Sequence, residues 1–234
     1  MCTLTFVPTN DSVIITSNRD EHKSRGDSEF PVTQTQNNRT ITFPKDPLAG
    51  GTWIAVDDSY RVNVLLNGAF EKHKHLPPYR LSRGIVLLNS YDFHDLKEFS
   101  KKYSLDEIEP FTLVQISNKD KYIQELRWDG MHYHLQEFDY ITPRIWSSST
   151  LYPKEIRDQR ELWFSDWLEN EEHTSESLLR FHQFGKDQPG KNTITMDRGN
   201  GLQTVSISQI HCNTAFLQFR HNNFISNRFS EVDL

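Results

Sequence analysis

Two β-prone runs decide the fold of this chain: Met1-Cys2-Thr3-Leu4-Thr5-Phe6-Val7 and Val13-Ile14-Ile15-Thr16-Ser17-Asn18-Arg19-Asp20-Glu21. The spacer between them, Pro-Thr-Asn-Asp-Ser at 8–12, is rich in turn-forming residues and has the length of a hairpin loop. We therefore predict strands over 3–7 and 13–17 that pair antiparallel. This pairing would set the polar residues 18–21 beside the N-terminus.

Cys2 is the first candidate catalytic residue, because it becomes residue one when the initiator Met is removed. Its thiol and a free α-amine then share one carbon, and an amine with a pKa near 8 can take the thiol proton without a separate base. A neighbouring cation such as Arg19 would lower the thiol pKa from its usual value of about 8.5. The alternative is that Cys2 is only a small apolar residue at the start of a strand.

The charged residues that end the second run also have two interpretations. They are either a solvated strand end followed by a loop, or a polar cluster that orients the amine and thiol. Strand alternation puts Asn18 and Asp20 on one face and Arg19 and Glu21 on the other, so the sequence does not decide which pair faces the thiol. We select Arg19 and Asp20 as catalytic candidates and Asn18 as a substrate-binding candidate.

Two later strand ends carry groups that suit acyl-transfer chemistry. Ala49-Gly50-Gly51-Thr52-Trp53 brings paired glycines into a strand, which indicates either close backbone approach or a tight turn. Another strand ends in Leu66-Asn67-Gly68-Ala69. There the Asn67 amide and the Gly68 N–H could donate to an oxyanion, or the pair could form a type I′ turn with Asn67 at positive φ. The sequence leaves both alternatives open.

Taken together, these residues resemble the NRDE family, also called the Transport and Golgi organisation 2 family. The resemblance rests on Met1-Cys2, Asn18-Arg19-Asp20-Glu21, Ala49-Gly50-Gly51-Thr52-Trp53, Ser82-Arg83-Gly84 and Phe111-Thr112-Leu113, and it covers most of the chain. The family resembles the N-terminal nucleophile hydrolases. The resemblance thus implies an α+β fold, a four-layer αββα sandwich with mostly antiparallel sheets.

The same resemblance implies roles for individual residues. Cys2 would be the nucleophile and Asn67 an oxyanion donor, while Trp53 and Gly68 would bind substrate. Ser148 is a further substrate-binding candidate, although the family's usual Ser-Asn is a serine run here. Arg198 is the nearest suggestion for the late arginine of the bile-salt hydrolases, and it does not align securely.

Composition limits the remaining possibilities. A chain of 234 residues with 35% hydrophobic content can form one sizeable core, so we expect one domain over residues 1–234. A net charge of −6 without a Lys/Arg cluster argues against a nucleic-acid partner. We see no signal-peptide pattern and no run of about eighteen apolar residues, and we expect a cytoplasmic protein without a membrane span. The two cysteines, Cys2 and Cys212, suggest neither a disulfide framework nor a zinc ribbon.

The segment His73-Lys74-His75 lacks further ligands that could complete a metal site, so we expect neither a metal nor a cofactor. The expected partner is a small-molecule substrate or ligand. The sequence leaves the oligomeric state open.

The remaining pattern predicts helices that cover the sheets. We expect helices over 82–90, 92–103 and 153–170, with Ile156, Trp163 and Trp167 on one stripe. A further helix should contain 178–181, with Thr174 or Ser175 as its N-cap and Gly185 as the residue that stops it. Further strands are expected over 40–43, 52–56, 61–66, 111–117, 122–128, 132–138, 204–209 and 214–220. Residues 31–38 show little periodicity, Cys212 falls at a predicted turn, and 187–201 is a predicted loop.

Two functions therefore compete at the level of sequence. The first is an N-terminal-cysteine hydrolase that cleaves a linear, non-peptide amide after removal of Met1. The second is a non-catalytic protein of the same fold that binds or traffics a small hydrophobic ligand such as haem or lipid, or supports secretory and Golgi organisation. Fold alone does not separate the two.

Overall fold

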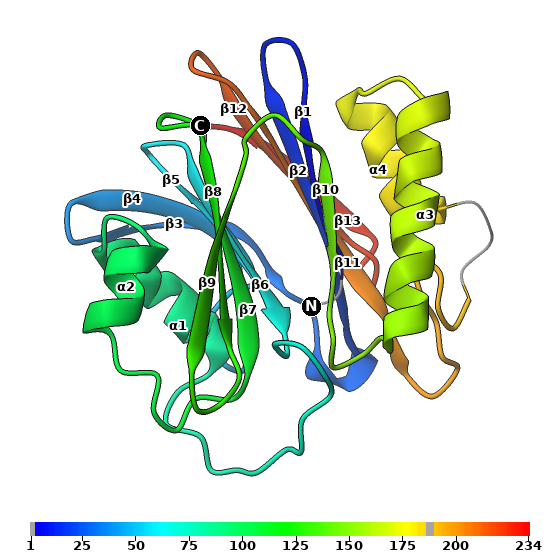
Figure 1. Ribbon diagram of the computed structural model, residues 1–234. Coiled ribbons are helices and arrows are strands. Elements are labelled where there is room, and N and C mark those ends of the chain that lie inside the picture. Colours follow the sequence, from blue (N-terminus) through cyan, green and yellow to red (C-terminus); the bar gives the residue numbers. More distant parts are fainter. Residues whose placement is uncertain (1–2, 186–189) are drawn as a thin grey trace. The chain divides into compact units, whose positions relative to one another are not determined.

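The computed structural model describes residues 3–185 and 190–234 (Figure 1). Cys2 and part of the predicted loop at 187–201 lie outside the described residues. The chain divides into two compact units, each described by itself below. Unit 1 takes its residues from 1–27, 141–148 and 152–234, and unit 2 from 28–140 and 149–151. The expectation of a single domain stays a prediction.

Unit 1 contains, among the described residues, a six-stranded antiparallel sheet with the order β10-β1-β2-β11-β12-β13. Its strands are β1 (Thr3–Pro8), β2 (Val13–His22), β10 (Arg144–Ser147), β11 (Leu202–Cys212), β12 (Leu217–Asn223) and β13 (Arg228–Asp233). The predicted hairpin is confirmed, because β1 pairs with β2 and places Thr3 opposite Asn18. On its other side β1 pairs with β10, where Ser147 lies opposite Thr3. The first strand is thus interior to the sheet.

Two helices, α3 (Lys154–Asn170) and α4 (Ser175–Phe184), pack on this sheet and contact β10, β2 and β11 (Figure 1). Thr174, one of the two N-cap candidates, caps α4 by accepting a hydrogen bond from the Ser177 N–H, and Gly185 ends the helix at φ 55° as predicted.

The buried stripe of α3 is Arg160, Phe164 and Trp167. These residues share one face because they are spaced i, i+4 and i+7. Of the predicted stripe, Trp167 is buried, Trp163 is half-buried and packs against the same apolar cluster, and Ile156 is half-buried.

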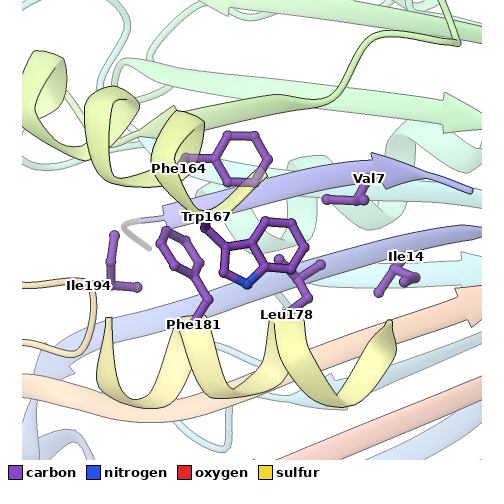
Figure 2. Close-up of a cluster of buried hydrophobic side chains, with 7 residues drawn as sticks. All are labelled: Val7, Ile14, Phe164, Trp167, Leu178, Phe181 and Ile194. Atoms are coloured by element: carbon purple, nitrogen blue, oxygen red, sulfur yellow. The ribbon is translucent and has the colours of Figure 1, made fainter. Parts of the chain in front are cut away.

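The helices and the sheet of unit 1 meet in a cluster of seven buried apolar side chains (Figure 2). Its members are Val7, Ile14, Phe164, Trp167, Leu178, Phe181 and Ile194. The Trp167 and Phe164 rings are stacked with centroids 5.9 Å apart. Burial of each such side chain contributes roughly 1.5–3 kcal/mol, so the cluster fixes α3 and α4 on β1 and β2.

Unit 2 contains a seven-stranded antiparallel meander in which the order in the sheet follows the order in the sequence, β3 to β9. Its strands are β3 (Glu29–Gln36), β4 (Arg39–Lys45), β5 (Ile54–Asp57), β6 (Arg61–Asn67), β7 (Phe111–Ser117), β8 (Tyr122–Trp128) and β9 (Tyr133–Phe138). Helix α1 (Arg83–Asn89) contacts β6, and α2 (Leu96–Lys102) contacts β8 and β9. Short 3-10 turns, η1 (Lys23–Arg25) in unit 1 and η2 (Ser90–Asp92) in unit 2, complete the described elements.

The paired glycines before β5 serve both purposes that the sequence left open. Gly50 adopts φ 69° in the turn. Gly51 approaches the start of α1 so closely that an added Cβ would lie 2.5 Å from the Gly84 carbonyl carbon. A Cβ on Gly84 would in turn lie 2.7 Å from the Thr52 carbonyl oxygen. Two glycines from separate sequence blocks therefore allow helix and turn to touch through their backbones.

The structure differs from the sequence patterns in three places. Residues 29–36, 144–147 and 228–233 are strands, β3, β10 and β13, at the edges of their sheets. Cys212 is not at a turn but is the buried last residue of β11. The polar residues after Ser17 do not leave the sheet, because β2 continues to His22.

Candidate active site

The polar end of β2 is buried, which distinguishes it from a solvated strand end. Asn18, Arg19 and Asp20 are at most 3% exposed. Buried polar and charged groups are costly unless they have hydrogen-bond partners, so three of them in sequence imply a built environment. This excludes the solvated interpretation of the charge run.

Asn18 faces the helices of unit 1 and is held by α4 and the segment that follows it. Its Nδ2 donates to the carbonyls of His182 (3.2 Å) and Ile194 (2.9 Å), and its Oδ1 lies 2.6 Å from His182 Nδ1. Because these contacts engage both ends of the amide, they favour an anchoring role. Its predicted substrate contact stays a prediction.

His182 completes this network in its neutral form. Burial, followed by the charge of Arg160, lowers the pKa of His182 to about 3. Since Asn18 Oδ1 can only accept, the ring donates from Nδ1, and Nε2 accepts from the Thr5 hydroxyl at 2.8 Å. The histidine thereby joins β1, β2 and α4.

Asp20 is a buried carboxylate with two hydroxyl donors. Its Oδ2 accepts from the Tyr152 hydroxyl at 2.9 Å, and its Oδ1 accepts from Thr204 Oγ1 at 2.5 Å. A β-bulge in β11 falls at this point, because Thr204 is opposite Asp20 while Ser206 is opposite Arg19. Bulges of this kind re-aim side chains and are frequent beside active sites.

Arg19 lies on the opposite face of the sheet from Asn18 and Asp20, as strand alternation requires. Its charge acts on His221 of β12, whose pKa is lowered to about 4 by burial and then by the charge of Arg19. The two catalytic candidates on β2 therefore occupy different faces of the sheet.

Asn67 and Gly68 end β6 in unit 2. Asn67 is half-buried, belongs to the strand and is not at positive φ, so the type I′ turn is excluded. Gly68 has φ 80°, its N–H donates to the Pro110 carbonyl at 3.0 Å, and its carbonyl accepts from Thr112 Oγ1 at 2.9 Å. The Gly68 N–H, which the sequence suggested as an oxyanion donor, thus already donates a hydrogen bond within unit 2.

The last two predicted substrate-binding residues, Trp53 and Ser148, are both buried. Trp53 is 3% exposed, and its carbonyl accepts from the Leu65 N–H at 2.9 Å, two residues before Asn67. Ser148 is 1% exposed and directly follows Ser147, the partner of Thr3 in β10. Its carbonyl accepts from the Tyr152 N–H at 3.1 Å.

Sequence reasoning missed Tyr152, Thr204, His182 and Arg160. Tyr152 and Arg160 are both completely buried, and the Arg160 guanidinium carbon lies 3.6 Å from the centroid of the Tyr152 ring. Arg198, the suggested late arginine, also lies over this ring at 5.7 Å. One signal was available, because an arginine in register with Phe164 and Trp167 on a helical stripe is unusual for a solvated side chain.

His73 and His75 both contact Glu109 Oε1 at 3.1 Å. Within residues 3–185 and 190–234, no group of three or more His, Cys, Asp or Glu side chains is arranged to hold a metal ion. No helix in the same ranges is long and apolar enough to cross a membrane.

Solved structures similar to this chain define its fold class. A variant of the conjugated bile acid hydrolase from Clostridium perfringens with one arginine replaced by leucine aligns with a TM-score of 0.57 and 11% identity, covering 99% of this chain and 92% of that chain. A cysteine-to-alanine mutant of the same hydrolase gives 0.56 and 11%, covering 100% and 92%. The N-acylethanolamine-hydrolyzing acid amidase ortholog of Caenorhabditis elegans gives 0.52 and 11%, covering 89% and 92%. The fold is similar to that of the N-terminal nucleophile hydrolases, and the predicted α+β class with mostly antiparallel sheets is confirmed.

Sequence comparison supplies the family. The Transport and Golgi organisation 2 family matches residues 1–180, and the chain belongs to this family. A search of curated proteins gave no match. The family predicted from the sequence motifs is thus confirmed.

Proposed function

We propose that this protein is an N-terminal-cysteine hydrolase that cleaves a linear, non-peptide amide after Met1 has been removed. The observation that carries the proposal is the surroundings of Thr3, the residue that follows Cys2. Thr3 lies opposite Asn18 in β2, and the next two residues of β2 are the buried Arg19 and Asp20. Two buried charges within two residues of the partner of Thr3 are expected where an amine and a thiol must be held in defined protonation states.

In the proposed reaction, the α-amine of Cys2 takes the thiol proton, and the sulfur attacks the carbonyl carbon of the amide. The tetrahedral intermediate collapses by breaking the C–N bond while the ammonium returns the proton to the leaving amine. Water, deprotonated by the same amine, then attacks the thioester, releases the acid and regenerates the thiol. The family resemblance assigns the donation to the oxyanion to Asn67.

The arrangement of Asp20 supports this use of the N-terminus. A carboxylate fixed by Tyr152 and Thr204 keeps one orientation, because both of its oxygens are engaged. Such a group can hold a nearby ammonium or polar hydrogen in place without moving during the reaction. We propose that Arg19, on the other face, stabilises the thiolate form of Cys2.

The first test is intact-mass analysis of protein purified from its native host, followed by labelling with a thiol-directed activity probe and peptide mapping. Cys212, the second of the two cysteines, is completely buried and is the internal control. We expect loss of Met1 and selective labelling of Cys2, and Cys2→Ala should abolish labelling while Cys212→Ser keeps it. Retention of Met1 in the native host would rule out the mechanism, because the amine would then be blocked.

The second test is hydrolysis of a panel of acyl amides, which should include a conjugated bile acid and an N-acylethanolamine because the similar structures carry those names. We expect release of the amine from at least one class of substrate by the wild type and not by Cys2→Ala. Tight binding of a panel member without turnover, with Cys2 unreactive, would instead favour the ligand-binding or trafficking alternative.

A further inference from the structure

The chain contains two Asn-Gly pairs, Asn67-Gly68 in unit 2 and Asn200-Gly201 in unit 1. In such a pair the backbone nitrogen of the glycine can attack the side-chain carboxamide of the asparagine, because glycine has no Cβ to hinder the approach. The attack needs a nitrogen that is free of hydrogen bonds and a carboxamide that is folded over it. The two pairs differ in both respects.

The sheet of unit 2 protects Asn67-Gly68. Asn67 is the last residue of β6 and pairs with Phe111 in β7, which holds its backbone in the extended conformation. The Gly68 N–H donates to the Pro110 carbonyl at 3.0 Å. This hydrogen bond would have to break before the nitrogen could attack, and a bond of ordinary net strength slows such a step by roughly tenfold.

Asn200 is exposed and lies in the bend before β11. Its neighbours Gly199 and Gly201 have φ 72° and φ 90°, so the chain turns on both sides of it. The Asn200 Oδ1 accepts from the Leu202 N–H at 3.2 Å, and this bond folds the carboxamide back over the Gly201 peptide. Among the described residues, the Gly201 N–H donates to no acceptor. The bend therefore places an available nitrogen beside the carboxamide.

His22, the last residue of β2, polarises the attacking peptide. Its Nδ1 accepts from the Ser24 N–H at 3.3 Å, so the ring carries its proton on Nε2 and donates it to the Asn200 carbonyl at 3.2 Å. This carbonyl and the Gly201 nitrogen belong to the same peptide group. The hydrogen bond therefore stabilises the negative charge that spreads onto the oxygen when the nitrogen loses its proton. The contact also requires glycine, because a Cβ on Gly201 would lie 2.6 Å from His22 Nε2.

We propose that Asn200 is a site of self-modification, at which the bend converts a carboxamide into a carboxylate. The Gly201 nitrogen forms a bond to Asn200 Cγ, the Leu202 N–H stabilises the oxyanion on Oδ1, and the Cγ–Nδ2 bond breaks. The proton lost by the Gly201 nitrogen leaves with the amide nitrogen as ammonia. Water then opens the resulting succinimide ring at either carbonyl, which leaves aspartate or isoaspartate at position 200.

The reaction changes the chain where β11 begins. Either product adds a negative charge next to His22, and isoaspartate also adds one methylene to the main chain before Leu202, the partner of His22 in the sheet. The Lys23 N–H, which donates to the Gly201 carbonyl at 2.8 Å, lies at the same junction. Because the reaction needs only water, it is independent of any hydrolase activity and accumulates with the age of the molecule.

The test is incubation of the full-length protein in heavy-oxygen water at pH values between 7 and 9, followed by tryptic digestion in ordinary water and peptide mapping. Tryptic peptide 199–220 carries Asn200, and peptide 62–72 carries Asn67. We expect uptake of heavy oxygen at Asn200 to be at least roughly tenfold faster than at Asn67. The rate at Asn200 should rise with pH, because the attacking nitrogen must lose its proton.

Asn213 is an internal control in the same tryptic peptide as Asn200. Its Oδ1 accepts from the Ala215 N–H at 2.7 Å, so its side chain is folded in the same way. The residue that follows it is Thr214, whose branched Cβ hinders attack by the backbone nitrogen. Asn213 should therefore stay unmodified, and fragmentation of the peptide separates the two positions.

Two variants complete the test. Asn200→Gln only lengthens an exposed side chain and should abolish the uptake in peptide 199–220. His22→Ala should slow the uptake roughly fivefold through the lost hydrogen bond. His173→Ala, at an exposed histidine of unit 1, is the matched control and should leave the rate unchanged.

Equally slow uptake at Asn200 and Asn67 in the wild type would overturn the proposal, and this comparison does not depend on the folding of any variant. Uptake that persists in Asn200→Gln would place the reaction at another residue and reject Asn200. A rate in His22→Ala equal to or above that of the wild type would overturn the role assigned to His22.

Discussion

Asn67 ends β6 with backbone geometry that other residues can adopt, since it is half-buried and not at positive φ. If it donates to an oxyanion, Asn67→Ala should lower turnover by roughly a hundredfold or more while ligand affinity changes little. Its melting temperature should change little, because no turn conformation is lost. Turnover or probe labelling, ligand affinity and thermal melting should be measured together. Unchanged turnover in a folded variant would remove Asn67 from the site.

Gly68 is constrained by both conformation and space. A Cβ there would lie 2.3 Å from Thr150 Oγ1 and 2.6 Å from Ser149 Oγ, at φ 80°. Gly50, also in unit 2, has φ 69° with nothing within 4 Å of its Cβ position. Gly50→Ala should lower the free energy of unfolding by about 1–2 kcal/mol, because its positive φ disfavours a residue with a Cβ. Gly68→Ala should lower it by about 1–3 kcal/mol more, because its Cβ would also meet the Ser149 and Thr150 side chains. If chemical unfolding gives the same loss of free energy for both variants, the Ser149 and Thr150 side chains must move aside freely.

At this scale the sequence predicted the positions of candidate residues better than their environments. The alternation of Asn18 and Asp20 against Arg19 follows from strand geometry and could be stated in advance. The hydroxyl donors to Asp20 could not, because Tyr152 and Thr204 are 132 and 184 residues away in the chain. Long-range partners of this kind leave no local pattern.

Among the elements, α1 has an unusual dependence on the glycine in its first turn. Alanine is preferred over glycine inside helices by about 1 kcal/mol, so Gly84→Ala would stabilise a solvated helix. Here the added Cβ would lie 2.7 Å from the Thr52 carbonyl oxygen and 2.8 Å from the Thr52 nitrogen, both backbone atoms that cannot rotate away. We therefore expect Gly84→Ala to lower the free energy of unfolding by about 1–3 kcal/mol.

Chemical denaturation followed by tryptophan fluorescence would measure this change. Lys101→Ala, at an exposed position of α2, is the control for a change in helix propensity and should be close to neutral. Any gain in stability by Gly84→Ala would show that α1 can shift away from the turn at Gly51.

The strands missed from sequence share a physical reason. β3, β10 and β13 are edge strands whose residues are mostly exposed or half-buried, so none shows the alternation that marks a strand with one buried face. The strands with buried faces, such as β6 and β7, were predicted to within one residue. These strands could be predicted because one buried face imposes an alternating pattern on the sequence, and not because of intrinsic β propensity.

For the molecule as a whole, two buried histidines make the free energy of unfolding depend on pH. The pKa of His182 is about 3 and that of His221 about 4, each lowered chiefly by burial from 6.5. Between those values and 6.5 the unfolded chain binds protons that the folded chain does not, so the free energy of unfolding should fall as the pH falls through this window. His182 alone would contribute a slope of about 1.4 kcal/mol per pH unit.

Urea unfolding of wild type and His182→Gln at several pH values between 4.5 and 7 would measure that slope. The variant should start less stable at pH 7, because Thr5 and Asn18 lose a partner, but its stability should fall less steeply with acid. His132→Gln, at an exposed histidine of the same chain, controls for the loss of a surface imidazole. Parallel curves for wild type and His182→Gln would contradict the neutral, buried state of this ring.

The interior position of β1 also has a practical consequence for anyone who produces this protein. The strand is paired on both sides and its first described residue, Thr3, is completely buried. An affinity tag fused ahead of Met1 would follow a path that begins next to this buried residue, so it is expected to disturb the fold. The other end is more accommodating: β13 is an edge strand, and Leu234 beyond it is 48% exposed. Purification handles and surface-immobilisation chemistry should be attached there.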